Sequence, residues 1–122
     1  MKGIKLSVRS EKPIYQQLYE QISSQVLNGE LTRDFSLPPI RTTAKELRVS
    51  IITVKKAWEA LEKAGLIYSI TGRGCFIADI TPKERKQKRQ EILRKQFEKD
   101  KSFYRNLGVD REEFIEIAME NY

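Results

Sequence analysis

Apolar residues recur at helical spacing over the first half of the chain and predict three helices. The first starts at Pro13, which is tolerated at a first helical position, and ends at Asn28-Gly29. A second, short helix is expected from about Pro39 to Leu47. A tight turn at Arg48-Val49 then leads to Ser50, a residue suited to cap the start of a third helix.

The third helix, which we expect to end before Gly65, has one apolar stripe and one polar face. The residues of the stripe follow the spacing i, i+3, i+4 and i+7: Val54, Ala57, Trp58 and Leu61. Ile52, Lys56 and Glu59 project from the opposite side at roughly 100° per residue. Trp58 is therefore expected in the core rather than stacked on bases.

Two β-rich runs follow the third helix and predict a hairpin. Leu66–Ile70 and Cys75–Ala78 flank Thr71–Gly74, a glycine-bearing loop of hairpin length. Cys75 lies in an apolar strand and is expected to be a small buried hydrophobe. The order of helix, turn, helix and hairpin is typical of a winged helix-turn-helix, in a mainly α (α+β) fold.

The last third of the chain predicts two more helices. A long charged helix opens at Thr81-Pro82 and reaches about Asn106, and Asp110 can cap a final helix. These helices would make a poor isolated domain, so we expect them to form a homodimer. The dimerisation residues would be Ile92, Leu93, Phe97, Tyr104, Leu107, Phe114, Ile117 and Ala118. We thus expect an N-terminal extended arm (1–12), a winged helix domain (13–78) and a helical dimerisation tail (79–122).

The charge distribution favours a polyanionic partner for the first two thirds of the chain. The net charge is +6, and residues 1–78 hold 12 Lys and Arg against 7 Asp and Glu, whereas residues 79–122 hold 11 against 10. There is no histidine and only one cysteine, and the carboxylates form no visible pair, so an enzyme, a metal site or a cofactor is not expected. No run has the length of a membrane span, and we expect a cytoplasmic protein.

At this point the chain resembles the GntR family of regulators, and within it the short YtrA-like group. The resemblance covers residues 13–78 well and extends to the helix break in the tail. The motifs that carry it are Pro13-Ile14-Tyr15-Gln16-Gln17, Gly29-Glu30-Leu31, Leu37-Pro38-Pro39-Ile40-Arg41, Thr53-Val54, Leu61-Glu62-Lys63-Ala64-Gly65-Leu66-Ile67, Gly72-Arg73-Gly74-Cys75-Phe76-Ile77 and Leu107-Gly108-Val109-Asp110.

The resemblance implies that the third helix enters the major groove of DNA and that the hairpin is a wing. It implies DNA contacts by Arg41, by Ser50, Thr53 and Lys55, and by Gly72 and Arg73. Helix N-termini favour phosphate, and glycines allow a close approach of the backbone. The full set that we expect to contact DNA is Arg41, Ser50, Ile52, Thr53, Lys55, Lys56, Thr71, Gly72, Arg73 and Gly74.

Three departures from the family pattern carry expectations of their own. Arg48 stands where a glycine is usual, so it is expected in a left-handed conformation at some cost. Arg33-Asp34 replaces the usual Pro-Gly. Ile51-Ile52 replaces a commonly polar pair, and Ile52 is expected to pack on a thymine methyl.

The sequence therefore predicts a homodimeric repressor that binds a short two-fold-symmetric site in double-stranded DNA. Any small-molecule effector is expected at the dimer interface, because the tail is too short for a separate effector domain. Three alternatives stay open: an adaptor that binds protein through the same scaffold, an RNA-binding winged helix, and an enzyme. A flat salt response of binding would favour the adaptor, and competition between duplex DNA and RNA would separate the second.

Overall fold

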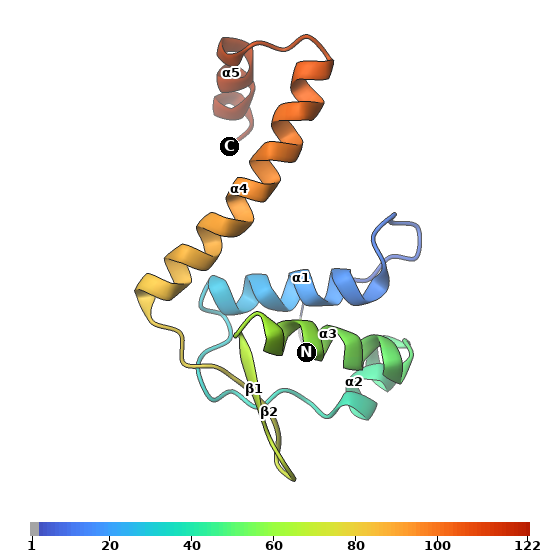
Figure 1. Ribbon diagram of the computed structural model, residues 1–122. Coiled ribbons are helices and arrows are strands. Elements are labelled where there is room, and N and C mark those ends of the chain that lie inside the picture. The colour runs from blue at the N-terminus through green and yellow to red at the C-terminus, as the bar shows by residue number, and fades with distance from the viewer. Residues whose placement is uncertain (1–2) are drawn as a thin grey trace. The chain divides into compact units, whose positions relative to one another are not determined.

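The computed structural model describes residues 3–122, so Met1 and Lys2 of the expected arm lie outside the described residues. Three helices, a two-stranded sheet and two further helices follow one another along the chain (Figure 1). Their bounds are α1 (Ile14–Leu27), α2 (Ile40–Leu47), α3 (Ile51–Lys63), β1 (Ile67–Ile70), β2 (Gly74–Ile77), α4 (Pro82–Asn106) and α5 (Arg111–Asn121). The chain divides into two compact units, residues 1–82, here the head, and residues 83–122, here the tail. The predicted mainly α winged helix fold is confirmed.

The core of the head lies where α1, α3 and the small sheet meet (Figure 1). Leu18, Ile22 and Val26 of α1 are buried, as is the apolar stripe of α3 with Trp58, whereas Ile14 at the start of α1 is half-buried. Ile77 of β2 and Ile80 of the following connection complete this core. Burying one such side chain completely contributes about 1.5–3 kcal/mol to the free energy of folding. Because the buried residues all belong to the head, the head has a core of its own.

The turn between α2 and α3 has the conformation that the missing glycine predicts. Arg48 ends α2 with φ 57° and ψ 46°, a left-handed conformation that costs a non-glycine residue about 1–3 kcal/mol. The Val49 backbone N–H donates to the Ala44 carbonyl oxygen at 3.0 Å, which satisfies an end of α2. This closed turn fixes where α3 begins.

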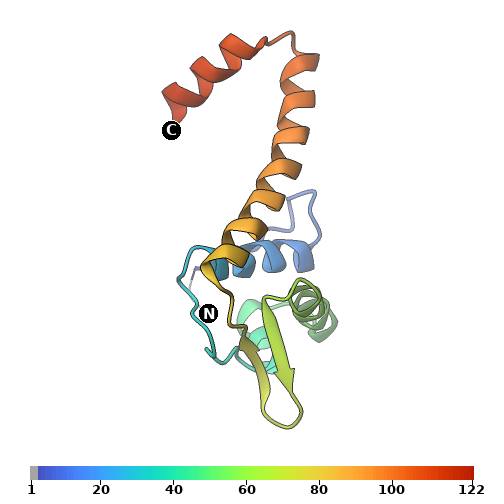
Figure 2. The same cartoon turned by 60° about the vertical axis from the view of Figure 1, so that its left-hand side comes forward.

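The wing is a hairpin with a third segment paired to it. β1 and β2 are antiparallel with Ile67 opposite Ile77 and Ile70 opposite Gly74. Gly74 therefore belongs to β2, and the loop has three residues rather than the four expected. Residues 34–37 add hydrogen bonds that the sequence did not predict, because this pairing joins segments about 40 residues apart: Asp34 N–H to Ile77 O, Ile77 N–H to Phe35 O and Leu37 N–H to Cys75 O. Figure 2 shows the hairpin projecting from the head as a ribbon.

Cys75 is half-buried, so the expectation of a buried cysteine is wrong. Its register partner is Ser69, and the Ser69 Oγ–Cys75 Sγ distance is 3.3 Å. The hairpin covers the core with only part of its length, since Ile67 and Ile77 are buried at its base while Ile70 is exposed at the far end of β1. Cys75 lies between these two levels and is covered on one side only.

The N-terminal segment is tied to α1 instead of extending freely. Gln17, nearly buried, accepts from the Ser7 N–H at 2.9 Å and donates to the carbonyl oxygens of Ser7 and Lys12 at 2.9 and 2.8 Å. Gln21 forms a similar pair of hydrogen bonds with the backbone of Lys5. Residues 7–12 form turns rather than an extended arm, and Pro13 is the N-cap of α1 rather than its first residue.

The tail consists of two amphipathic helices without a core. α4 has 25 residues and α5 has 11, and Asp110 caps α5 as predicted by accepting from the Glu113 N–H at 2.9 Å. No residue of either helix is buried. Between residues 3 and 122, no helix combines the length and apolar character needed to cross a membrane.

Candidate nucleic-acid interface

The first turn of α3 is closed by its own hydroxyl groups. Ser50 Oγ accepts a hydrogen bond from the Thr53 N–H at 3.0 Å, and the two side-chain hydroxyls lie 2.8 Å apart. One hydroxyl hydrogen is used between them, so one is left to donate outward. The remaining N–H groups of the first turn make this helix end suited to a phosphate oxygen.

The exposed face at the start of α3 is partly apolar. Ile51 is 42% exposed and Ile52 is 77% exposed. Lys55 is also exposed, whereas the Lys56 ammonium lies over the ring of Tyr15 at 4.0 Å from its centroid. A cation held over an aromatic face gains about 0.5–1 kcal/mol at an exposed site, so Lys56 is drawn towards α1.

Arg41 is the second residue of α2, and its side chain is exposed. Among residues 3–122 it has no acidic side chain within ion-pairing distance. α2, which carries Arg41, packs on α3. A planar guanidinium can bind a phosphate or a guanine edge with two hydrogen bonds.

The wing loop is exposed and depends on two glycine conformations. Gly72 and Gly74 have φ values of +79° and +112°, and an added Cβ at either would meet nothing within 4 Å. Backbone conformation, rather than lack of space, therefore requires glycine at both positions. The Arg73 N–H donates to the Ile70 carbonyl oxygen at 2.9 Å, which fixes the backbone of the loop while the Arg73 side chain remains exposed.

A polar cluster at the base of the wing was not expected from the sequence. The Tyr68 hydroxyl donates to Asp34 Oδ1 at 2.9 Å, and Arg33 lies 3.5 Å from Asp34 and 3.2 Å from Asp79. The hydrogen bond to Asp34, helped by burial, raises the pKa of Tyr68 above its usual value. Asp34 has φ 64°, a left-handed conformation that glycine, the usual residue at this position in the family pattern, adopts more easily. The replacement of the usual Pro-Gly by Arg33-Asp34 was the sequence signal from which this polar cluster could have been predicted.

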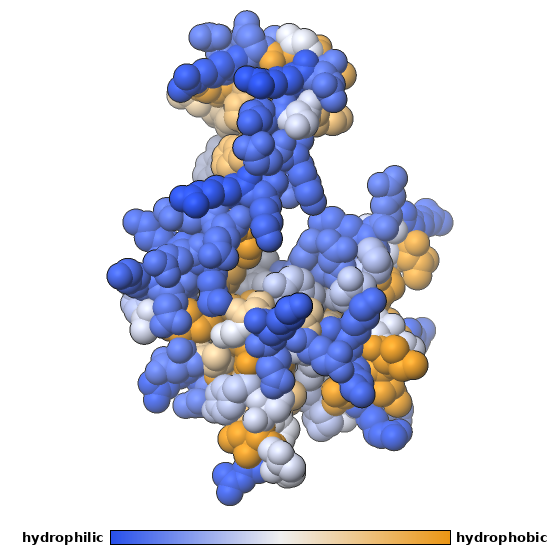
Figure 3. Space-filling model, in the orientation of Figure 1, coloured by the Kyte–Doolittle hydropathy of each residue, from blue (hydrophilic) through white to orange (hydrophobic). Residues whose placement is uncertain are grey.

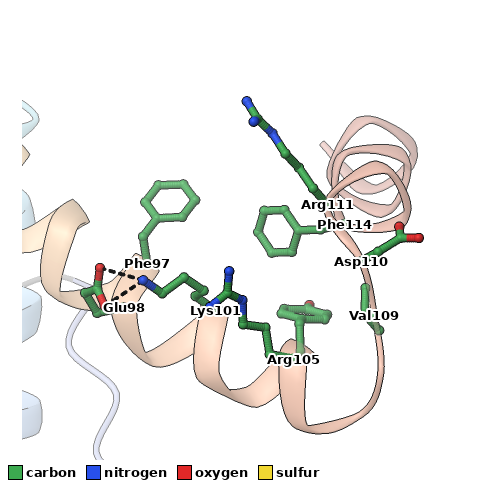
Figure 4. A pocket seen from close by; sticks show the side chains of 9 residues that line it. Phe97, Glu98, Lys101, Arg105, Val109, Asp110, Arg111 and Phe114 are labelled. Carbon is green, nitrogen blue, oxygen red and sulfur yellow. Dashed lines mark hydrogen bonds and ion pairs between the residues drawn. The ribbon is translucent and has the colours of Figure 1, made fainter.

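Three of the residues expected to dimerise, Phe97, Tyr104 and Phe114, line an open hollow of the tail. Tyr104 and Phe114 meet edge to face, with ring centroids 5.0 Å apart, and join α4 to α5. Phe97 and Phe114 point into the same hollow of about 510 Å³, which Arg105 and Arg111 also line (Figure 4). Other exposed apolar residues on these helices were not predicted: Phe103, Ile115 and Met119.

Comparison with known proteins identifies what the head is similar to. Residues 14–77 match the family described as bacterial regulatory proteins, gntR family. The HTH-type transcriptional repressor NagR of Bacillus subtilis is 40% identical over 73 residues, which cover 60% of this chain and 30% of NagR. The repressor YtrA of the same organism is 34% identical over 76 residues, covering 62% of this chain and 58% of YtrA. The chain thus spans less than two thirds of these two relatives.

Two further similarities extend the comparison. The uncharacterized regulator YhcF of Bacillus subtilis is 30% identical over 111 residues, which cover 88% of each chain. A GntR family transcriptional regulator from Listeria monocytogenes superposes with a TM-score of 0.80 at 25% identity, over 93% of this chain and 98% of that one. The DNA-binding domain of AraR in complex with operator ORX1 superposes with a TM-score of 0.55 at 30% identity, over 62% of this chain and 96% of that one.

Proposed function

The chain belongs to the GntR family of bacterial regulatory proteins, and from this membership we propose that it is a DNA-binding transcriptional repressor. We propose further that it acts in the cytoplasm as a homodimer on a short palindromic operator. The relatives are transcription regulators rather than enzymes. The head would supply the DNA contacts and the tail would join two chains.

The observation that carries the DNA-binding proposal is the set of exposed, unpaired cationic side chains on α2, on α3 and in the wing loop. Arg41, Lys55 and Arg73 are exposed and have no acidic partner among residues 3–122. Such cations can bind the phosphate backbone of DNA, and the counterions that this releases from the DNA favour binding. α3 would lie in the major groove, and the wing would follow the adjacent minor groove.

The contacts would divide into those that fix the position of the head and those that select the sequence. The N–H groups and the free hydroxyl hydrogen of the Ser50–Thr53 pair suit phosphate oxygens. Arg41, Ile52 and Lys55 suit base edges in the major groove, while Arg73 suits the minor groove. Lys56 starts from its position over Tyr15 and would have to leave that ring to reach a phosphate.

The homodimer proposal is supported by the surface of the tail. Neither helix of the tail contains a buried residue. Several large apolar residues of the tail are more than half exposed: Ile92, Leu93, Phe97, Phe103 and Leu107. A second copy offers the same apolar residues and nearly neutral charge, so pairing would bury both sets. A two-fold dimer of heads would require a two-fold DNA site.

The hollow between α4 and α5 is the place where a small-molecule effector would act. Its aromatic rings offer an apolar surface, and three cationic side chains against the two carboxylates of Glu98 and Asp110 leave a positive excess, a combination suited to an organic anion. Because the hollow lies beside the surface proposed for pairing, a bound effector would change the spacing of the two heads.

The test is selection from a random duplex library, followed by affinity measurement against salt. We expect a palindromic motif and a logarithmic affinity that falls with a slope of about −0.9 for each phosphate contacted. Competition with duplex RNA should leave binding intact. A folded protein that enriches no motif and shows a flat salt response would contradict the proposal and favour a protein-binding adaptor.

A further inference from the structure

We propose that α3 recognises pyrimidines that carry a C5 methyl group, through an apolar ridge formed by Ile51 and Ile52. The inference rests on the proposed function, because it names the bases that the same interface selects. In the major groove only thymine among the standard bases presents such a methyl group, and 5-methylcytosine presents the same one. The chemistry recognised is the methyl group, whichever pyrimidine carries it.

The exposure of the two isoleucines is the first step of the argument. They are the first two residues of α3, and the more exposed one, Ile52, has 77% of its surface open to solvent. One exposed hydrophobe is ordinary, but two adjacent ones make the first turn of this helix unusually apolar for an exposed helix end. Figure 3 shows an apolar patch at the end of the head where α2 and α3 meet.

The second step concerns the polar groups beside this ridge. The hydroxyls of Ser50 and Thr53 are 2.8 Å apart and bond to each other, and the Lys56 ammonium rests over Tyr15. Purines are usually selected by side chains that make two hydrogen bonds, such as Asn or Gln to adenine and Arg to guanine. The first turns of α3 present no Asn, Gln or Arg; Lys55 can bond to guanine, so the exposed isoleucines are the side chains of these turns suited to a pyrimidine methyl group.

The third step is the choice of DNA rather than a protein as the occupant of the ridge. Lys55 lies on the same helix as the ridge and Arg41 lies on α2, which packs on α3; both are exposed and without acidic partners among residues 3–122. A polyanion that carries apolar groups between its two rows of phosphates complements this arrangement in both charge and polarity. The floor of a major groove that contains thymine has these properties.

The experiment uses the full chain and the duplex that selection enriches. Each thymine is replaced in turn by deoxyuridine, which deletes the methyl group and keeps every hydrogen-bonding group, and affinity is measured by fluorescence anisotropy. We expect about fourfold weaker binding at one or two positions in each half-site, the value for one buried methyl group. In Ile52→Ala the thymine and deoxyuridine duplexes should bind equally at one of these positions.

Two further variants keep the test specific. Ile52→Asn restores a polar side chain and should also lose the difference between thymine and deoxyuridine, while its thermal unfolding stays that of the wild type. Ile70→Ala truncates another exposed isoleucine, 40% exposed against 77% for Ile52, beside the wing loop, and should keep the difference. At each sensitive position a cytosine pair and a 5-methylcytosine pair are then compared. We expect a gain of about fourfold with 5-methylcytosine, and no gain would contradict recognition of the methyl group on either pyrimidine.

The outcomes separate this inference from the function on which it rests. An enriched duplex whose deoxyuridine scan is flat overturns the methyl contact and leaves the DNA-binding proposal standing. A difference that persists in Ile52→Ala but disappears in Ile70→Ala moves the contact to the wing and also overturns it. If Ile52→Ala changes the oligomeric state instead of base preference, the ridge binds protein. If no duplex is enriched, both proposals fail.

Discussion

The head and the tail use apolar residues in opposite ways. In the head, Leu18, Val54 and Leu61 are fully buried, and the core joins helices to the sheet. In the tail, a comparable set of large apolar residues lines α4 and α5, yet none is buried. The difference teaches that the head contains the interactions needed to fold, whereas the tail has the residues for a core but not the second surface.

The charges of the two regions follow the same division. Residues 1–78 carry a net charge of +5, from 12 basic and 7 acidic residues, and residues 79–122 carry +1, from 11 and 10. Like charges oppose association between two copies of one surface, so a nearly neutral tail suits pairing with itself. The basic head instead suits a polyanion.

Removing the tail should have the largest effect on DNA binding. A chain that ends at Pro82 keeps the whole core of the head and should remain folded and monomeric. Its affinity for a palindromic site should fall by about 10²-fold or more, because the second head no longer binds intramolecularly. Circular dichroism, sedimentation and anisotropy measure the three properties. A truncated chain that binds as tightly as the full chain would break the division of roles.

A matched pair of leucine truncations separates the two kinds of apolar residue. Leu61→Ala should lower the free energy of unfolding by about 2–5 kcal/mol at every protein concentration, because it opens a cavity in the head. Leu93→Ala, at a site 52% exposed in one chain, should lower the melting temperature only where the chain is dimeric.

Thermal unfolding over a wide range of protein concentration measures both variants. The comparison would be wrong if Leu93→Ala destabilised the chain equally at all concentrations, since that would mean a core within one tail.

Arg41→Ala should weaken specific DNA binding by about ten- to a hundredfold and reduce the salt slope, because a bidentate contact contributes about 1–3 kcal/mol. The matched control is Lys63→Ala, an exposed cation in the last turn of α3. Titration of the selected duplex at several salt concentrations measures both. Equal losses in the two variants would mean that only overall charge matters.

Tyr68→Phe should have the smallest effect. It removes the hydrogen bond to Asp34 at the base of the wing and keeps the ring stacked on Phe76, with centroids 5.6 Å apart. We expect weaker DNA binding with little change in melting temperature, since the wing is positioned less firmly.

The same tyrosine predicts a dependence on pH. Its pKa is raised in the folded state, chiefly by the hydrogen bond to Asp34, so its stabilising effect is present below pH 10 and is lost as the pH rises through the folded value. Ultraviolet titration of the wild type against Tyr68→Phe measures this. A tyrosine that titrates at or below its ordinary pKa would contradict the predicted contact.

Local features of the fold were predictable because they depend on residues near one another in sequence. The stripe of α3 and the cap at Asp110 follow from spacing and from single-residue preferences, and the left-handed Arg48 follows from the glycine usual at that position in the family that the chain resembles. The hydrogen bonds of Gln17 to the N-terminal segment and the pairing of residues 34–37 with β2 could not be predicted in this way. These contacts join segments far apart in the sequence, and the spacing of apolar residues within one element does not show which segments will meet.

The residues of the candidate site also divide into those whose placement could be predicted from the sequence and those whose placement could not. The positions of Arg41, Ser50 and Arg73 on exposed surface followed from the motifs, since each lies at a turn or a helix end. The placement of Lys56 over Tyr15 did not, because it depends on how α1 crosses α3. Cys75 was misplaced for a related reason, since strand alternation does not tell how far along a hairpin the core extends.

The central claim is that two chains, joined through their tails, bind one two-fold DNA site through their heads. The most direct test is the mass in sedimentation of the full chain, 14.3 kDa per copy, mixed with a duplex that contains one complete selected site. The account predicts a complex of two full-length chains and one duplex. The protein that ends at Pro82 should first form a complex of one chain and one duplex, because its two copies bind independently. One full-length chain per duplex at saturation would contradict it.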